Sequence, residues 1–235
     1  MAETTTYAQQ RERLRDYFDR TASETWARLT SDAPVSRIRQ TVREGRDQMR
    51  ATLLSRLPDD LSGARVLDAG CGAGQMAIEL AERGAKVTAV DISPKLLDVA
   101  RERTPETLRP AIDFVAGDML DPAHGAFDFV VAMDSLIHYR PADIASVLAR
   151  LSERTQQTIV FTVAPRTPLL TAMHTAGKAF PRGDRSPAIA PISTGRLSRE
   201  LIKTGAVDWR LSNVRRIARG FYISQAMELS REVRG

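Results

Sequence analysis

The feature that most constrains this fold is a short stretch, residues 66–74, which reads Val-Leu-Asp-Ala-Gly-Cys-Gly-Ala-Gly. Apolar residues typical of a buried strand lead into three glycines, Gly70, Gly72 and Gly74, each separated by one residue. Glycines let the backbone turn sharply and let a ligand approach peptide N–H groups at the start of the next helix. The stretch therefore predicts a strand, a turn and a helix that form a nucleotide-type pocket.

The residues after Ala64 alternate between short apolar strands and amphipathic helices. Strands are predicted at 65–68, 86–90, 112–116, 127–133 and 158–163, and helices after the glycine turn, from Pro94 and at 141–151. Strands that alternate with helices favour a doubly wound α/β fold with a parallel sheet. A further helix at 193–205 and two closing strands, near 209–214 and 221–229, predict an antiparallel hairpin at the end of the sheet.

Two other segments depart from this alternation. Residues 7–31 and 35–57 predict two helices, and the second carries an apolar stripe opposite a face rich in arginine. We assign residues 1–62 to an N-terminal helical extension and residues 63–235 to the main domain.

Prolines punctuate the chain after Val163, around one short apolar helix predicted at 169–180. A connection this long inside a compact domain is usually functional. We therefore expect a lid insertion after the fifth strand, at about residues 164–192.

Charge and cysteine content limit the possible partners and compartments. The net charge of +5 conceals an uneven distribution, since residues 163–235 carry 13 basic and 5 acidic side chains. Such an excess suits nucleic acid, anionic lipid or a small anionic substrate, and it equally suits a solvated surface. Cys71 is the single cysteine, so no disulfide can form within the chain, and we expect a reducing, cytoplasmic setting. No run approaches the about 18 apolar residues of a membrane-spanning helix, so we expect any membrane contact to be peripheral.

Acidic residues follow the predicted strands where ligands bind in such sheets, beyond the carboxyl ends. Asp91 lies 23 residues after Asp68, at a spacing that suits the two hydroxyls of a ribose. Asp118 and Met119 suit an adenine, and Asp68 could hold a methionine amino group. Together with the D-x-G-x-G-x-G turn, this order resembles the S-adenosylmethionine (SAM) dependent methyltransferases. The candidate cofactor-binding residues are Asp68, Gly70, Gly72, Gly74, Asp91, Ile92, Asp118, Met119 and Asp134.

Two alternative functions for the segment with the glycine turn and the acids, NAD binding and methylation of nucleic-acid bases, are disfavoured. The NAD fingerprint G-x-G-x-x-G requires a glycine at position 75, which is Gln75. Enzymes that methylate nucleic-acid bases carry an Asn/Asp-Pro-Pro-Tyr/Phe clamp or a Pro-Cys nucleophile after the fourth strand. This chain instead reads Met-Asp-Ser-Leu-Ile-His-Tyr at residues 133–139.

Several segments outside the SAM motifs resemble one family. They are Asp16-Tyr17-Phe18-Asp19 with Trp26, Val42-Arg43-Glu44-Gly45-Arg46, residues 133–139, Phe161 to Pro165 continued at Phe180-Pro181-Arg182, and Arg219-Gly220-Phe221-Tyr222-Ile223-Ser224. Through these segments, the sequence resembles the magnesium-protoporphyrin IX O-methyltransferases of bacteriochlorophyll biosynthesis. The resemblance implies a Rossmann-like, seven-stranded sheet with N-terminal helices and a lid.

The resemblance also implies an activity. SAM would donate a methyl group to a propionate carboxylate of magnesium-protoporphyrin IX, giving the monomethyl ester and S-adenosylhomocysteine (SAH), without a protein-bound metal. Tyr17 and His138 are the implied catalytic residues, although His138 could equally cap the fourth strand. The implied partners are the porphyrin itself, the porphyrin-binding subunit of the magnesium chelatase and the surface of the photosynthetic membrane, with no nucleic acid.

Two alternatives stay open. One is SAM-dependent O-methylation of another small acceptor, such as a quinone precursor. The other is a non-catalytic protein with a SAM fold that binds RNA or a protein partner.

Overall fold

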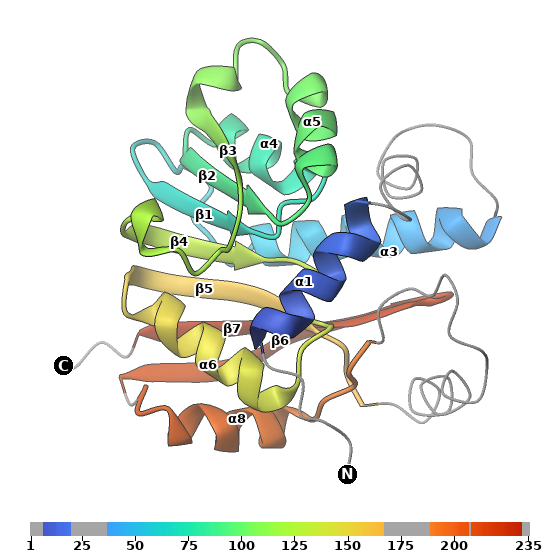
Figure 1. The fold of residues 1–235 in the computed structure, drawn as a ribbon, viewed down its shortest axis with the longest axis vertical. Helices are drawn as coiled ribbons and strands as arrows, with labels where there is room; N and C mark the ends of the chain where they lie inside the picture. Colours follow the sequence, from blue (N-terminus) through green and yellow to red (C-terminus); the bar gives the residue numbers. More distant parts are fainter. Residues whose placement is uncertain (1–6, 20–36, 167–188, 207, 232–235) are drawn as a thin grey trace.

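A computed structural model describes residues 7–19, 37–166, 189–206 and 208–231. Its centre is a seven-stranded sheet in the order β3-β2-β1-β4-β5-β7-β6 (Figure 1). Strands β1 to β5 run parallel, β7 is antiparallel to β5, and β6 is antiparallel to β7. The strands are β1 Arg65–Ala69, β2 Lys86–Asp91, β3 Ile112–Ala116, β4 Phe127–Ala132, β5 Thr155–Val163, β6 Trp209–Arg219 and β7 Tyr222–Arg231. The predicted Rossmann-like, doubly wound sheet with a closing hairpin is confirmed.

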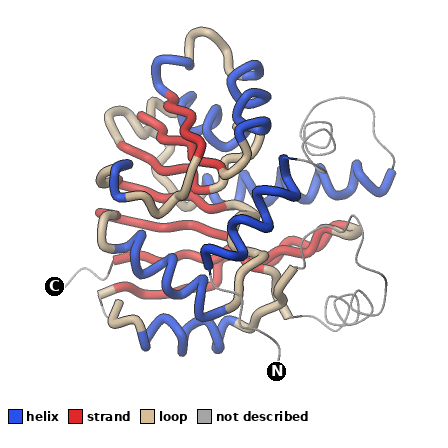
Figure 2. Tube along the Cα trace, in the orientation of Figure 1, coloured by secondary structure: helices blue, strands red, loops and turns tan. Residues whose placement is uncertain are grey.

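Helices cover both faces of the sheet (Figure 2). The helices are α1 Tyr7–Tyr17, α3 Arg37–Leu54, α4 Gln75–Glu82, α5 Pro94–Arg103, α6 Pro141–Ser152 and α8 Thr194–Lys203, with short 3-10 turns at Arg109–Ala111 and Pro122–His124. Side chains of α6 and α8 share one buried cluster with α1, while those of α3, α4 and α5 share the other.

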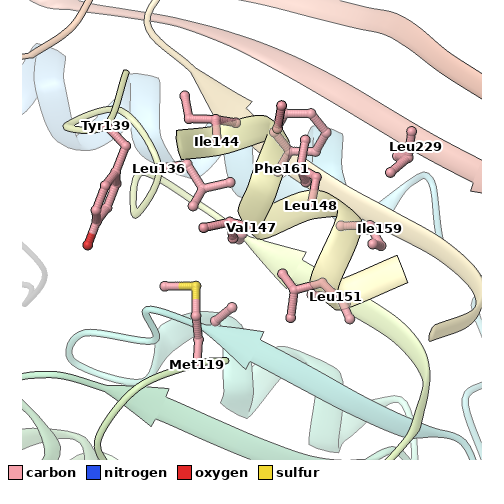
Figure 3. Close-up of a cluster of buried hydrophobic side chains, with 14 of the residues drawn as sticks. Met119, Leu136, Tyr139, Ile144, Val147, Leu148, Leu151, Ile159, Phe161 and Leu229 are labelled. Atoms are coloured by element: carbon pink, nitrogen blue, oxygen red, sulfur yellow. The ribbon is translucent and has the colours of Figure 1, made fainter. Parts of the chain in front are cut away.

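Alternating side chains along the central strands supply both cores. On β1, Val66 packs with the α3-α4-α5 cluster and Leu67 with the α6-α8 cluster, and both are fully buried. Figure 3 shows the α6-α8 cluster, in which Leu148 of α6 packs near Phe161 of β5. A parallel sheet covered on both faces has apolar strands throughout, which is why the sequence predicted these strands well.

The start of α5 was predictable from the local sequence. Ser93 caps α5 by accepting a hydrogen bond from the Leu96 N–H at 3.4 Å, and Pro94 occupies the first helical position. This arrangement is a common helix start. The closing strands are longer than predicted, because β6 and β7 pair along most of their length across the turn at Gly220.

Some predictions fall outside the described residues. The first predicted helix is seen as α1, and its continuation through residues 20–31 lies in the part that is not described. The predicted lid is described only at its ends, where Pro165 and Ile192 form a parallel bridge and the N–H of Arg166 donates to the Ile192 carbonyl at 2.9 Å. The predicted helix at 169–180 lies outside the described residues.

Candidate active site

A cavity of about 110 Å³ opens at the carboxyl ends of β1 to β4. Besides these strand ends, α1 and α3 contribute to its wall. Its lining residues are Tyr7, Leu14, Phe18, Arg46, Arg50, Asp68, Gly70, Cys71, Gly72, Ala73, Gln75, Met76, Val90, Asp91, Ile92, Leu96, Gly117, Met119, Met133, Asp134, Ser135, His138 and Tyr139. The cavity lies where open α/β sheets bind ligands, because the crossovers diverge on either side of β1 and leave a crevice there.

The glycine turn forms one wall. Gly70, Gly72 and Gly74 have φ angles of 87°, 54° and 82°, in the left-handed region that favours glycine. A side chain on Gly70 would start 2.3 Å from the Ser135 Cβ, and one on Gly74 would start 2.8 Å from the Ala100 Cβ. Gly70 and Gly72 line the cavity, whereas Gly74 lies outside it and allows close packing against α5.

Asp91 is held rigidly beside this turn. Its carboxylate accepts the Gly72 N–H at 2.8 Å through one oxygen and the Ser93 N–H at 2.9 Å through the other. Burial raises the pKa of Asp91, and these two hydrogen bonds oppose that rise. Each carboxylate oxygen has a second lone pair, so the group can still accept two hydroxyl donors.

Asp68 is the least satisfied acid of the cavity. It is 1% exposed, and its Oδ2 has no hydrogen-bond partner among the described residues. Burial, followed by repulsion from Asp91, raises the pKa of Asp68 to about 8. A buried carboxylate beside a cavity with one oxygen lacking a hydrogen bond favours binding of a cationic group there.

Asp118 and Met119, the two residues predicted to contact the adenine, differ in whether they face the cavity. Met119 lines the cavity, but Asp118 does not, because its carboxylate faces α1. The Tyr7 hydroxyl donates to Asp118 Oδ1 at 2.8 Å, and Arg11 pairs with Oδ2 at 2.5 Å. The Leu120 N–H also donates to Oδ1 at 2.9 Å, so Asp118 anchors α1 across the edge of the cavity.

Asp134 lines the cavity but is also engaged by the protein. It forms an ion pair with Arg46 at 2.5 Å, and the hydroxyl of Tyr222 donates to it at 3.1 Å. Its place after β4 predicted a cofactor ligand, whereas in the structure its carboxylate is bound by Arg46 and Tyr222.

The two implied catalytic residues are not equally placed. His138 lines the cavity, and its ring lies 6.3 Å from that of Phe18, measured between centroids. Tyr17 is not among the lining residues and packs edge-on against Phe18 instead. The tyrosine of α1 that does line the cavity is Tyr7, whose ring stacks on that of Tyr139 with centroids 5.2 Å apart.

Tyr7, Arg46 and Arg50 also line the cavity but were not predicted to do so. For Tyr7 a signal exists, since Tyr7 and Leu14 lie seven residues apart, at a spacing that puts them on one face of α1, and Phe18 follows four residues later. For Arg46 there is no local signal, because its partner Asp134 lies 88 positions away. The face of α3 that is rich in arginine thus supplies cavity residues, with Arg46 and Arg50 side chains only 16% and 15% exposed.

Two kinds of feature are absent from the described residues. No group of three or more histidine, cysteine, aspartate or glutamate side chains in the described ranges could hold a metal ion. No helix within those ranges is both long and apolar enough to cross a bilayer.

The residues of the cavity fit SAM. Asp68 offers a buried carboxylate oxygen, Oδ2, that has no partner among the described residues, and a methyl group added at Gly72 would meet nothing within 4 Å, so the turn leaves room beside bare backbone. A methyltransferase-domain family model matches residues 66–157, the segment that contains the turn and its acids. Fold and site together define the class of this protein as a SAM-dependent methyltransferase.

Comparison with known proteins narrows the class. A family model for the C-terminus of magnesium-protoporphyrin IX methyltransferase matches residues 132–231. The chain is 56% identical to the magnesium-protoporphyrin O-methyltransferase of Rhodobacter capsulatus, over 94% of this chain and 97% of that one. It is 32% identical to the enzyme of the same name from Synechocystis, over 72% and 74% of the two chains. This chain belongs to the magnesium-protoporphyrin O-methyltransferase family.

A solved structure agrees with this assignment. The crystal structure of magnesium protoporphyrin IX methyltransferase from Synechocystis, with bound SAH, superposes with a TM-score of 0.78 at 27% sequence identity. The match covers 94% of this chain and 99% of that chain. The likeness therefore extends over nearly the whole chain and not only over residues 66–157.

Proposed function

We propose that this protein transfers the methyl group of SAM to one propionate carboxylate of magnesium-protoporphyrin IX, giving the monomethyl ester and SAH in bacteriochlorophyll biosynthesis. The observation that carries the proposal is the 56% identity to the R. capsulatus enzyme over nearly the full length of both chains. The identity therefore extends far beyond residues 66–157, the segment that the methyltransferase-domain model matches.

The chain's own residues bind and orient the methyl donor. The glycine turn leaves room for it, Asp91 accepts the ribose hydroxyls, and Asp68 faces its positive charge. Ile92 and Met119 supply apolar surface for the adenine ring. SAM supplies an electrophilic methyl group, and the remaining work is alignment.

The acceptor needs little activation. A propionate carboxylate is ionised at neutral pH, so it can attack without a strong general base. Most of the rate enhancement then comes from holding the carboxylate oxygen in line with the methyl carbon and from excluding water from that oxygen. His138, which lines the cavity, would orient the propionate, and Tyr17, which packs against the cavity residue Phe18, would have a supporting role.

A direct assay tests this function. The purified protein is incubated with SAM labelled in its methyl group and with magnesium-protoporphyrin IX, and the ester is quantified by chromatography. We expect a labelled monomethyl ester and one equivalent of SAH. Methylation of a quinone precursor, with no ester formed on the porphyrin, would support the alternative acceptor instead.

A non-catalytic role is separated by a second measurement. A protein that only binds RNA would show affinity that falls steeply with salt and no turnover on any porphyrin. Turnover on the porphyrin with no RNA binding at physiological salt would rule out that role.

The partners of the enzyme are a further part of the proposal. The basic excess of residues 163–235 supports peripheral contact with an anionic photosynthetic membrane by a cytoplasmic protein. Since the porphyrin substrate is apolar, direct transfer from the porphyrin-binding subunit of the magnesium chelatase would avoid its release into water. Flotation with anionic vesicles and pull-down with that subunit are the corresponding measurements.

A further inference from the structure

Asp134 has an unusual backbone conformation. Its φ is 56°, and it is the one residue other than glycine with positive φ among those described. Aspartate enters this region more easily than most residues but still at a cost, so the conformation persists only where the surroundings impose it. The contacts of Asp134 supply that constraint.

Three side chains from distant elements hold Asp134. Arg46 of α3 pairs with Oδ2 at 2.5 Å, and the Tyr222 hydroxyl of β7 donates to Oδ1 at 3.1 Å. The Thr162 hydroxyl of β5 donates to Oδ1 at 3.2 Å and accepts the Asp134 backbone N–H at 2.7 Å. The Asp134 side chain is only 7% exposed, so these contacts form away from competing water.

The loop that begins at Asp134 carries functional groups. Ser135 packs against the glycine turn, since a side chain on Gly70 would start 2.3 Å from its Cβ. The carbonyl of His138 accepts from Gln10 Nε2 of α1 at 3.3 Å, and the His138 ring lines the cavity. The direction in which the chain leaves β4 therefore sets the position of Ser135 beside the glycine turn and the position of the His138 ring in the cavity.

We propose that Asp134 is a positioning residue for methyl transfer. Its carboxylate, held by Arg46, Tyr222 and Thr162, locks the left-handed turn that places Ser135 against Gly70 and presents His138 to the acceptor. This inference rests on the proposed function and assigns Asp134 a role other than the cofactor contact expected from its place after β4. The lock also joins α3 and the C-terminal hairpin to the donor site.

Tyr222→Phe is the most informative variant, because Tyr222 does not line the cavity and the change removes only a hydroxyl. We expect kcat for ester formation to fall about tenfold, with the Kd for SAM and the KM for the porphyrin each within about twofold of wild type. A rise in KM alone would indicate direct binding rather than positioning.

Glu228→Gln is a matched control. Glu228 of β7 pairs with Arg56, just after α3, at 2.5 Å, so the change weakens a contact between the same parts of the molecule. Neither residue lines the cavity. We expect a similar shift in Tm to that of Tyr222→Phe but an unchanged kcat, which separates positioning from loss of stability.

Asp134→Asn and its combination with Tyr222→Phe complete the test. Asparagine tolerates the left-handed conformation but cannot form the ion pair, so kcat should fall further, and the double variant should be no slower than Asp134→Asn alone. A loss of SAM affinity in Asp134→Asn that Tyr222→Phe does not share would overturn the inference in favour of a direct cofactor contact. So would a kcat for Tyr222→Phe equal to that of Glu228→Gln. Either result leaves the proposed function standing, because that depends on wild-type turnover.

Discussion

At the scale of single residues, two buried carboxylates lie at neighbouring strand ends and differ in their partners. Asp91 receives backbone N–H groups on both oxygens, whereas Asp68 has one oxygen without a hydrogen bond among the described residues. The first is therefore held in a fixed orientation. The second is a group whose charge depends on what occupies the cavity.

The raised pKa of Asp68 predicts that SAM affinity depends on pH. Since the pKa is about 8 in the free protein, Asp68 holds a proton at lower pH that a bound cation displaces. Affinity should thus fall about tenfold for each pH unit below about 8 and level off above it. Calorimetry in buffers of different ionisation enthalpy would show the proton released.

Asp68→Asn supplies the control for this prediction, because it keeps the shape and removes the ionisation. Its SAM affinity should be weaker and nearly independent of pH in the same range. If wild type and variant have the same pH profile, another group is responsible. Comparison with SAH, which lacks the sulfonium charge, separates attraction of the sulfur from attraction of the amino group.

The ribose assignment of Asp91 predicts loss of SAM binding on substitution. Asp91→Ala removes two acceptors for hydroxyl donors, each worth about 1.5–3 kcal/mol when the acceptor is charged, so Kd should rise about 100-fold or more. Asp113→Ala, on the exposed side of β3, is the matched control and should leave Kd unchanged. An unaltered Kd for Asp91→Ala would show that Asp91 does not bind the ribose hydroxyls.

The two implied catalytic residues predict different outcomes by their positions. His138 lines the cavity, so His138→Ala should lower ester formation about 10- to 100-fold without comparable loss of SAM binding. Tyr17 lies outside the cavity wall, so Tyr17→Phe should have a smaller effect than Tyr7→Phe. Steady-state rates with both substrates saturating provide the comparison, and full activity of all three variants would leave alignment alone as the mechanism.

At the scale of secondary structure elements, α1 is held across the cavity by polar contacts at its two ends and by one apolar face. Tyr7 and Arg11 bind Asp118 near the start, and Asp19, just after the helix, accepts from the Ser93 hydroxyl at 2.6 Å. Such contacts are weaker than a packed apolar face, although Leu14 adds a buried anchor. Because α1 forms part of the cavity wall, these are the contacts that must break for the helix to move away from the cavity.

This attachment predicts faster opening of α1 when the ion pair is removed. Arg11→Gln breaks a partly exposed pair worth about 1 kcal/mol, so amide hydrogen exchange within α1 should accelerate about fivefold. Arg15→Gln changes the charge of an exposed residue on the same helix and should leave exchange unaltered. Equal exchange in the two variants would mean that Asp118 does not anchor α1.

At the scale of the whole molecule, the N-terminal and C-terminal parts meet through close backbone approach. A side chain on Gly45 of α3 would start 2.6 Å from Tyr222 Cδ1, and one on Gly220 would start 2.5 Å from Thr41 Oγ1. These glycines let α3 pack tightly on the hairpin of β6 and β7. This packing brings Arg46 within reach of Asp134.

The close approach predicts destabilisation when a methyl group is added. Gly45→Ala should lower the free energy of unfolding by about 1–3 kcal/mol, since the Tyr222 ring must move despite the better helix propensity of alanine. Gly195→Ala in α8 is the control, because nothing lies within 4 Å of the added group. Urea unfolding gives both values, and an unchanged stability for Gly45→Ala would show that the ring yields freely.

Much of the fold was predictable because its signals are local. The five parallel strands are short apolar runs, and the start of α5 follows from Ser93 and Pro94, which act within one turn of helix. The boundaries of β6 and β7 were less predictable. Residues 215–219 of β6 include three arginines, and they form a strand by pairing with residues 222–226 of β7 across the turn.

The sequence by itself determined the class of methyl donor, SAM, since the glycine turn and the order of the acids depend only on spacing along successive strand ends. It also determined the family, through segments spread over the whole chain. Only the tertiary structure decided which of these residues face the cavity. Asp118 turns to α1, Asp134 turns to Arg46 and Tyr222, and Tyr7 rather than Tyr17 lines the wall. The physical reason is that such contacts join positions about 90 or more residues apart, whose meeting depends on how the whole chain packs.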